Sequence, residues 1–275
     1  MKVVLFCGGL GTRLREHSDT IPKPLVPIGP RPILIHLMQH YAHYGHKDFI
    51  VCLGYRGDMI REYFLGYDPY LTDDVVIGPN GTRKGSPESD ISSWRITLVD
   101  TGMHSNLGER LLAVRKHVES EDVFLANYCD QLSDVNLDRY HQQFFETNTT
   151  AGFLSVRPTQ SYHFVQTNGG GLVERLVAAN TTDHRINGGF FILRGSIYDY
   201  IKPGEELVER PFARLAAQRQ LWTLRYDGFW QSMDTFKDKI AFDRMWGRGD
   251  LPWKAGLETT LQEHDVEETA IEASR

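Results

Sequence analysis

The residues with the most distinctive chemistry lie near the start of the chain. A glycine-rich segment, Gly8 to Arg13, directly follows the apolar run Val3 to Phe6. Because glycines let backbone N–H groups approach an anion that side chains would crowd away, the segment suits a phosphate ligand. Lys23 follows between Pro22 and Pro24, which restrict the backbone around it. Arg13 and Lys23 would together neutralise a triphosphate that is attacked at its α-phosphorus.

Two common nucleotide-binding motifs do not describe this loop. The dinucleotide fingerprint G-x-G-x-x-G requires a third glycine where Leu14 stands when the motif is counted from Gly9. The P-loop pattern G-x-x-x-x-G-K-[ST] does not occur in the chain. The sequence therefore disfavours both a nicotinamide-dependent oxidoreductase and a P-loop NTPase.

The charge is distributed unevenly. The formal net charge is -6, which argues against a broad basic face for nucleic acid. Residues 1–35 nevertheless hold five basic and two acidic residues around the glycine loop, a balance suited to a small anion. Residues 256–275 hold six acidic residues and one basic residue. We expect a domain over 1–255 and a solvated acidic tail, or a loosely held final helix, over 256–275.

Composition places the chain among ordinary globular proteins. Hydrophobic residues make up 41% of its 275 residues and charged residues 24%. No apolar run approaches the roughly 18 residues of a membrane span, and the N-terminus lacks a signal-peptide core. The three cysteines form no CxxC pair, which favours reduced thiols over a disulfide framework or a zinc site. We therefore expect a cytoplasmic protein with no membrane partner.

Elements of two types alternate along the chain. Apolar runs predict strands at 3–6, 49–53, 95–99, 123–126, 152–156, 189–193 and 221–226. Helical spacing predicts helices from Ile33 to a stop at Gly45 and over 59–64, 111–118, 137–146 and 209–219. This alternation favours an α/β layered domain with a largely parallel sheet. The segment from Asp68 to Ser93, rich in Gly, Pro, Asp and Ser, is interpreted as an insertion or a long functional loop.

Several segments in order resemble one enzyme family. The strings GGLGTRL, PKPLVPIG, WRITLVDTG, INGGFF and GFWQSMDT are similar to those of sugar-1-phosphate nucleotidyltransferases, closest to the glucose-1-phosphate cytidylyltransferase branch. The resemblance extends to about residue 245. It implies a Rossmann-like nucleotidyltransferase fold, with a mostly parallel mixed central sheet flanked by helices. It further implies a homo-oligomer that joins an NTP and a sugar 1-phosphate into an NDP-sugar and pyrophosphate.

The same resemblance assigns roles to individual residues. It implies nucleotide binding by Gly8, Gly9, Gly11, Thr12, Arg13 and Lys23, with Gly108 and Arg110 near the base or phosphates. It places Mg²⁺ at Asp130 and Asp234, and the sugar at Asn187 and Gly188.

Elementary chemistry supports these roles. A sugar phosphate is ionised at pH 7, so catalysis reduces to aligning and neutralising two anions that repel each other. Two carboxylates with phosphate oxygens and water would complete the oxygen shell that Mg²⁺ prefers. Asp130 follows the predicted strand 123–126, and open α/β sheets bind ligands at the carboxyl ends of their strands.

Three positions depart from the family pattern. The usual Tyr-Gly-Asp-Gly is replaced by Tyr128 to Gln131, and the Glu-Lys-Pro segment that holds sugar and phosphate is replaced by Ala178 to Asn180. Glu109 stands where the cytidylyltransferase branch has glycine. We hypothesise that Arg185 or His184 substitutes for the missing lysine, or that the acceptor is an unusual sugar or cyclitol phosphate. Transfer from another NTP and a non-catalytic nucleotide-binding homologue remain as alternatives.

Two further constellations are not assigned to chemistry. Four histidines, His36, His40, His43 and His46, recur at a spacing that could present imidazoles to zinc. Because no cysteine or carboxylate pattern joins them, we interpret them as the polar face of a helix. Cys129 is not expected to act as a nucleophile, since the adjacent carboxylate of Asp130 disfavours a thiolate.

Overall fold

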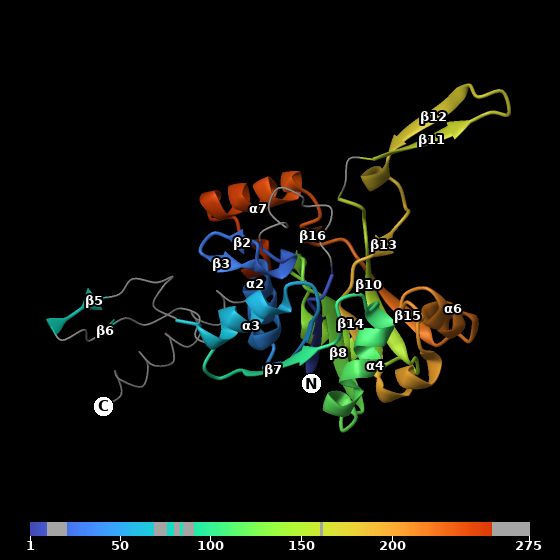
Figure 1. Ribbon diagram of the computed structural model, residues 1–275. Helices are drawn as coiled ribbons and strands as arrows, with labels where there is room; N and C mark the ends of the chain where they lie inside the picture. Colours follow the sequence, from blue (N-terminus) through green and yellow to red (C-terminus); the bar gives the residue numbers. More distant parts are fainter. Residues whose placement is uncertain (10–20, 69–75, 80–82, 85–90, 160–161, 255–275) are drawn as a thin grey trace, which may run out of the picture.

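An eight-stranded mixed sheet forms the centre of the computed structural model, which describes residues 1–9, 21–68, 76–79, 83–84, 91–159 and 162–254 (Figure 1). The strands follow the order β13-β10-β14-β8-β1-β4-β7, and β15 pairs with the other edge of β10. Their bounds are β1 Val3–Phe6, β4 Asp48–Leu53, β7 Arg95–Asp100, β8 Val123–Tyr128, β10 Ala151–Val156, β13 Ile186–Asn187, β14 Phe191–Arg194 and β15 Leu221–Tyr226. The α/β sheet expected from the sequence is therefore confirmed.

Strand direction places the N-terminal loop and Asp130 at the same edge of the sheet. β1 is parallel to both of its neighbours, β4 and β8, while β14 is antiparallel to β8. Phe6 is in register with Tyr128, so the chain leaves both strands at the same level. The segments that follow, Gly8-Gly9 and Asp130, therefore emerge side by side at the carboxyl ends of the strands.

Alternate residues of the strands enter two hydrophobic cores. On β1, Val3 and Leu5 join the core on one face of the sheet, whereas Val4 and Phe6 join the core on the other. Helices α2 (Ile33–His43), α3 (Gly57–Leu65) and α5 (Leu137–Phe145) contribute to the first core, and α4 (Leu107–Val118) and α6 (Arg210–Ala217) to the second. Because successive strand residues point to opposite faces, helices cover the sheet on both sides.

Local capping signals mark the starts of two helices, one longer than predicted and one not predicted. Asn106 and Glu109 form a reciprocal capping box, so α4 begins at Leu107, before the predicted 111–118. Thr235 and Asp238 form a second capping box at the start of α7 (Phe236–Arg248), a helix that the sequence analysis did not predict. A left-handed Gly249 ends α7.

The strand predicted at 189–193 begins later than expected. Gly189 has a φ of 69° and Phe190 a φ of 51°, which is left-handed backbone that cannot continue a strand. β14 therefore starts at Phe191, and the two residues before it form a turn.

Among the described residues, four small two-stranded sheets complete the fold. β9 (Gln131–Ser133) pairs with β16 (Trp230–Ser232), and β2 (Pro27–Ile28) pairs with β3 (Arg31–Pro32). β5 (Val76–Ile77) pairs with β6 (Arg83–Lys84) inside the predicted 68–93 insertion, most of which lies outside the described residues, as does the tail 256–275. β11 (His163–Thr167) pairs with β12 (Val173–Ala178) in a hairpin that projects from the body (Figure 1).

Within the described part of the chain, no helix has the length and apolar character needed to cross a membrane.

The interpretation of the histidines as a polar face is wrong for three of the four. His36, His40 and His46 are buried. His36 lies against a second layer formed by α7 and the turn after it, whereas His40 packs against Tyr44 and Phe190, and His46, beyond the end of α2, packs against His141 of α5. Trp246 of α7 and Trp253 of the following turn lie with their ring centroids 5.6 and 6.0 Å from that of His36. Hydropathy spacing along one helix does not report such a layer.

These buried histidines should make folding sensitive to acid. Burial lowers the pKa of His36 and of His40 to about 4, whereas an unfolded chain takes up protons near 6.5. The unfolded state therefore binds more protons between these values, and stability is lost as the pH falls from 6.5 toward 4, by up to about 1.4 kcal/mol per pH unit for each histidine.

We predict that His40→Phe reduces this loss of stability on acidification, because phenylalanine keeps an aromatic side chain at this position but does not titrate. The measurement is the free energy of unfolding by chemical denaturation at pH 7.0 and 5.5. His104→Phe, at an exposed histidine, is the matched control. Equal pH dependence of the His40 variant and the unaltered protein would contradict the assignment.

Candidate active site

Lys23 lies between two carboxylates that come from distant parts of the chain. Its Nζ donates hydrogen bonds to Asp130 Oδ2 at 2.6 Å and to Asp234 Oδ1 at 2.8 Å. The side chain of Lys23 is 13% exposed, and those of Asp130 and Asp234 are 28% and 24% exposed. The three residues predicted to meet substrate and metal thus form one partly buried charged cluster.

Pairing of β9 with β16 brings the two aspartates together. Asp130 directly precedes β9, and Asp234 is the second residue after the end of β16. Gln131 is in register with Ser232, and the Met233 amide donates to the Asp130 carbonyl at 2.7 Å. This backbone contact holds together the two segments that carry the carboxylates.

Further contacts hold Lys23 and Asp234 in place. Lys23 is the first residue of a short 3-10 turn (η1, Lys23–Leu25), and Pro22 before it has an extended backbone. The Lys23 carbonyl accepts a hydrogen bond from the Val26 amide at 3.1 Å. The second oxygen of Asp234 accepts from Ser232 Oγ at 2.8 Å. The Asp234 amide donates to Asp238 Oδ2 at 3.1 Å, in the cap of α7. Both side chains therefore start from anchored backbone.

Electrostatics keep Lys23 charged. Burial alone would lower the pKa of this ammonium, but the negative charges of Asp130 and Asp234 outweigh burial, so the pKa is raised above its ordinary value. Among the described residues, the ammonium of Lys23 is thus a cation that both carboxylates share.

The donor set fits a magnesium ion. Asp130 and Asp234 offer carboxylate oxygens, which Mg²⁺ prefers, and a cationic group already lies between them. Two protein carboxylates leave room for phosphate oxygens and water in a six-coordinate shell. Among the described residues, no group of three or more His, Cys, Asp or Glu forms an alternative metal site.

Arg110 supports the glycine loop from within the protein. Its Nη2 donates to the Gly8 carbonyl at 2.9 Å, and its Nη1 donates to the Leu53 carbonyl at 3.1 Å and to Thr101 Oγ1 at 2.6 Å. A Cβ added at Gly8 would lie 2.1 Å from Nη1, so a larger residue there would displace the guanidinium. The predicted site residues Gly8 and Arg110 are thus in contact. Gly9 follows directly, whereas Gly11, Thr12 and Arg13 lie outside the described residues.

Gly108 and Glu109 have local structural roles at the start of α4. A Cβ at Gly108 would lie 2.1 Å from the Glu205 carbonyl oxygen, so the helix packs closely against that segment. The Glu109 carboxylate accepts from the Asn106 amide at 2.9 Å as part of the capping box. The glutamate that departs from the family pattern therefore stabilises the helix end.

The predicted sugar-binding turn lies beside the strand that leads to Asp130. Asn187 Nδ2 donates to Tyr128 Oη at 3.1 Å, and Asn187 Oδ1 accepts from the Gly189 amide at 2.9 Å. The Gly188 carbonyl accepts from Trp230 Nε1 at 2.9 Å. Side chains from β8 and β16 thus fix the turn to the same strands that carry the two aspartates.

Gln131 is a bridging residue whose role the sequence analysis missed. Its buried Nε2 donates to Asn127 Oδ1 and to the Gly188 carbonyl, both at 2.7 Å. A Cβ at Gly189 would lie 2.0 Å from that nitrogen. The glutamine that replaces a family glycine therefore fills space and ties β9 to the turn predicted to bind the sugar. The departure itself was the signal, but its partner Gly188 is 57 residues away.

Arg185 makes contacts within the protein. Its Nη1 donates to the carbonyls of Ser155 and Tyr226 at 3.1 and 2.9 Å, and its Nη2 donates to Asp227 at 2.7 Å. Arg157 and Arg185 hydrogen-bond to Asp227 and lower its pKa. Arg185 therefore joins β10, β13 and the end of β15.

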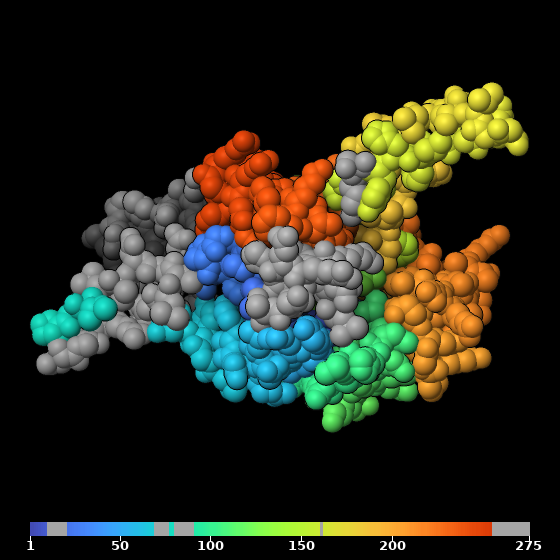
Figure 2. Space-filling model, turned by 45° about the horizontal axis from the view of Figure 1, so that its top comes forward, coloured from blue at the N-terminus to red at the C-terminus, as the bar shows by residue number. Residues whose placement is uncertain are grey.

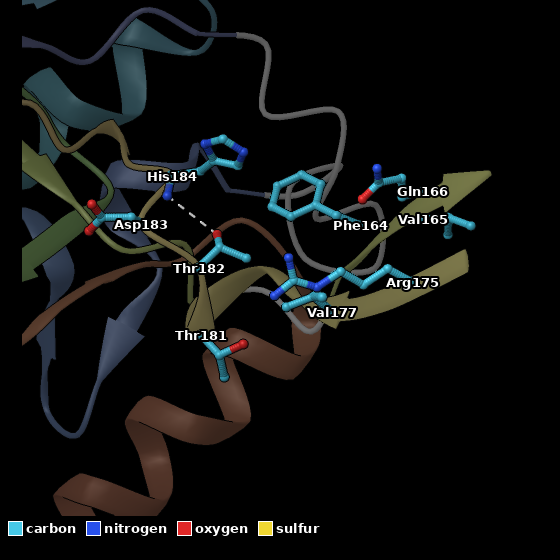
Figure 3. A pocket seen from close by; sticks show the side chains of 9 residues that line it. All are labelled: Phe164, Val165, Gln166, Arg175, Val177, Thr181, Thr182, Asp183 and His184. Atoms are coloured by element: carbon cyan, nitrogen blue, oxygen red, sulfur yellow. Dashed lines mark hydrogen bonds between the residues drawn. The ribbon is translucent and has the colours of Figure 1, made fainter. Parts of the chain in front are cut away.

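His184, the other candidate for replacing the lysine, lines a pocket of about 510 Å³ at the base of the hairpin (Figure 3). Its ring centroid lies 5.3 Å from that of Phe164, and Arg175 of β12 lines the same pocket. His184 and Arg185, although adjacent, thus contact different surroundings.

Comparisons with known proteins agree with this architecture. The family model described as nucleotidyl transferase matches residues 2–210. A glucose-1-phosphate cytidylyltransferase of Salmonella typhimurium is 36% identical over 267 residues, covering 92% of this chain and 99% of the relative. The protein of that name from Salmonella typhi is 37% identical over 255 residues, with the same coverage.

A solved structure supports the fold. A UDP-glucose pyrophosphorylase complexed with UDP-glucose matches with a TM-score of 0.67 at 15% identity, covering 90% of this chain and 98% of that one. The Rossmann-like fold expected from the sequence is therefore confirmed.

We predict that Gln131→Leu lowers the free energy of unfolding by about 0.5–1.5 kcal/mol, because the Gly188 carbonyl loses one of its two donors and Asn127 Oδ1 also loses a donor. Chemical denaturation at pH 7.5 measures the change. Gln142→Leu, the same substitution at an exposed position of α5, is the control and should change stability little. Equal effects of the two substitutions would show that the bridge does not stabilise the fold.

Proposed function

Because the chain belongs to the nucleotidyl transferase family, we propose that it joins CTP and glucose 1-phosphate into CDP-glucose and pyrophosphate. The enzyme is a sugar-phosphate nucleotidyltransferase, and the choice of these two substrates rests on its cytidylyltransferase relatives, which match over nearly their whole length. The observation that carries the chemistry is the contact of Lys23 with both Asp130 and Asp234.

The reaction requires two anions to approach each other. An oxygen of the sugar phosphate attacks the α-phosphorus of the NTP, the new P–O bond forms, and the bond to the bridging oxygen breaks as pyrophosphate leaves in line. Because the attacking phosphate is already ionised, no general base is needed. The protein contributes alignment and positive charge.

The chain's own residues divide this work. Gly8 and Gly9 present backbone, supported by Arg110, to the NTP phosphates, and Lys23 supplies an ammonium beside them. Arg13, with Gly11 and Thr12, is assigned to the same phosphates on the sequence alone. Asp130 and Asp234 would hold Mg²⁺, which supplies charge neutralisation at the phosphates when bound.

The acceptor is assigned to the turn at Asn187 and Gly188. Contacts with Tyr128, Gln131 and Trp230 support this assignment because they leave the turn little freedom. Gly108 remains a predicted neighbour of the nucleotide. Arg185 remains a predicted phosphate ligand, and to act it would exchange contacts that it makes within the protein.

The test is a matrix of nucleotides and acceptors. Purified protein with Mg²⁺ is incubated with CTP, UTP, GTP or dTTP and each of a panel of sugar and cyclitol phosphates, and pyrophosphate release is measured. We expect the highest kcat/KM for CTP with glucose 1-phosphate. A higher value for another pair would overturn the substrate choice. Nucleotide binding by calorimetry with no pyrophosphate from any pair would instead indicate a non-catalytic nucleotide-binding homologue.

We further propose that the protein is a homo-oligomer and that the hairpin β11–β12 contacts a second copy. Figure 2 shows the hairpin standing clear of the body. Val165 and Leu176 are cross-strand partners on one of its faces, 57% and 62% exposed. Clustered exposed apolar side chains of this kind mark interaction surfaces. The cytoplasmic location remains a prediction from the sequence.

We predict that Leu176→Glu reduces the molar mass measured by light scattering after size exclusion, because it places a charge in the contact. Leu65→Glu, at an exposed leucine of α3 on the body, should leave the mass unchanged. A monomeric unaltered protein would contradict the homo-oligomer, and an unchanged mass for Leu176→Glu would contradict the contact through the hairpin.

A further inference from the structure

The ammonium of Lys23 occupies the place between the two carboxylates that a metal would take. Nζ lies 2.6 Å from Asp130 Oδ2 and 2.8 Å from Asp234 Oδ1. An Mg²⁺ ion bound to these same two oxygens would lie about 2.0–2.1 Å from each. An ion that approached these oxygens from the side of Lys23 would overlap the ammonium and be repelled by its charge. Lys23 and the metal therefore compete for the aspartates.

The fold fixes the backbone of Lys23 beside the two aspartates but leaves its side chain able to move away from them. The prolines on either side fix the backbone of Lys23, and Pro24 is buried. The side chain beyond is a flexible four-carbon stem with a compact charge. Nucleotide phosphates held by the nearby glycine loop would offer the ammonium other anionic partners. Lys23 can then move from carboxylate to phosphate while its backbone stays in place.

We propose that Lys23 is an internal cation that blocks the two-aspartate site until nucleotide phosphates draw it away, so that the divalent ion enters with the nucleotide. This inference rests on the proposed function, since it takes Asp130 and Asp234 as metal ligands. The loss of affinity for metal depends on the fraction of molecules in which Lys23 occupies the site. If Lys23 leaves the site open in one molecule in ten, the apparent affinity for metal falls about tenfold.

The experiment measures Mn²⁺ binding to the nucleotide-free protein by electron paramagnetic resonance. We expect Lys23→Met to bind Mn²⁺ at least about tenfold more tightly than the unaltered protein, because methionine keeps the unbranched shape without the charge. Lys23→Arg keeps the charge and should remain weak. Lys239→Met is the matched control, because Lys239 also pairs with an aspartate, Asp243 at 2.6 Å, but lies outside the cluster.

Each outcome decides between the inference and the proposed function. Tighter binding in Lys23→Met that is abolished by adding Asp130→Asn supports the inference. Tighter binding that survives Asp130→Asn places the metal elsewhere and overturns it. Equal binding by Lys23→Met and the unaltered protein also overturns it, and the proposed function still stands if the unaltered protein releases pyrophosphate with Mg²⁺. Circular dichroism of each variant establishes that it is folded.

Discussion

Two carboxylates that share one ammonium are the interaction on which the site depends. Asp130 and Asp234 lie 107 and 211 residues from Lys23 along the chain, so only the folded protein brings the three charges within hydrogen-bond distance. Two carboxylates that lie together repel each other unless a cation lies between them. The surrounding structure therefore has to hold both carboxylates at one cation, and this constraint explains why so many backbone contacts converge there.

The fold meets the constraint through strand ends. Parallel pairing of β1 with β8 brings the glycine loop and Asp130 to one edge of the sheet, and pairing of β9 with β16 adds Asp234. The same short strands carry Gln131 and Trp230, whose side chains fix the carbonyl of Gly188. One small sheet thus sets both the charged cluster and the turn assigned to the acceptor, so that a shift in either would be transmitted to the other.

The sequence predicted the parts of this arrangement that leave a local or family signal. The strand before Asp130 is a buried apolar run, and matched segments around Lys23 and Asp234 pointed to the same cluster that the structure forms. Pairing of β9 with β16 could not be predicted, because each strand has three residues and the contact spans about a hundred positions. The burial of His36 depends on Trp246 and Trp253, which no spacing along its own helix reveals. The capping box at Thr235 was a local signal that went unused.

A crystal structure with CTP and Mg²⁺ tests the central claim most directly, namely that Lys23, Asp130 and Asp234 surround a single ligand. The account predicts one metal ion bound by both aspartates and by phosphate oxygens, the glycine loop against the same phosphates, and the Lys23 ammonium in contact with the nucleotide. A nucleotide bound with its phosphates away from these three side chains, while Lys23 still bridges the two aspartates, would contradict it.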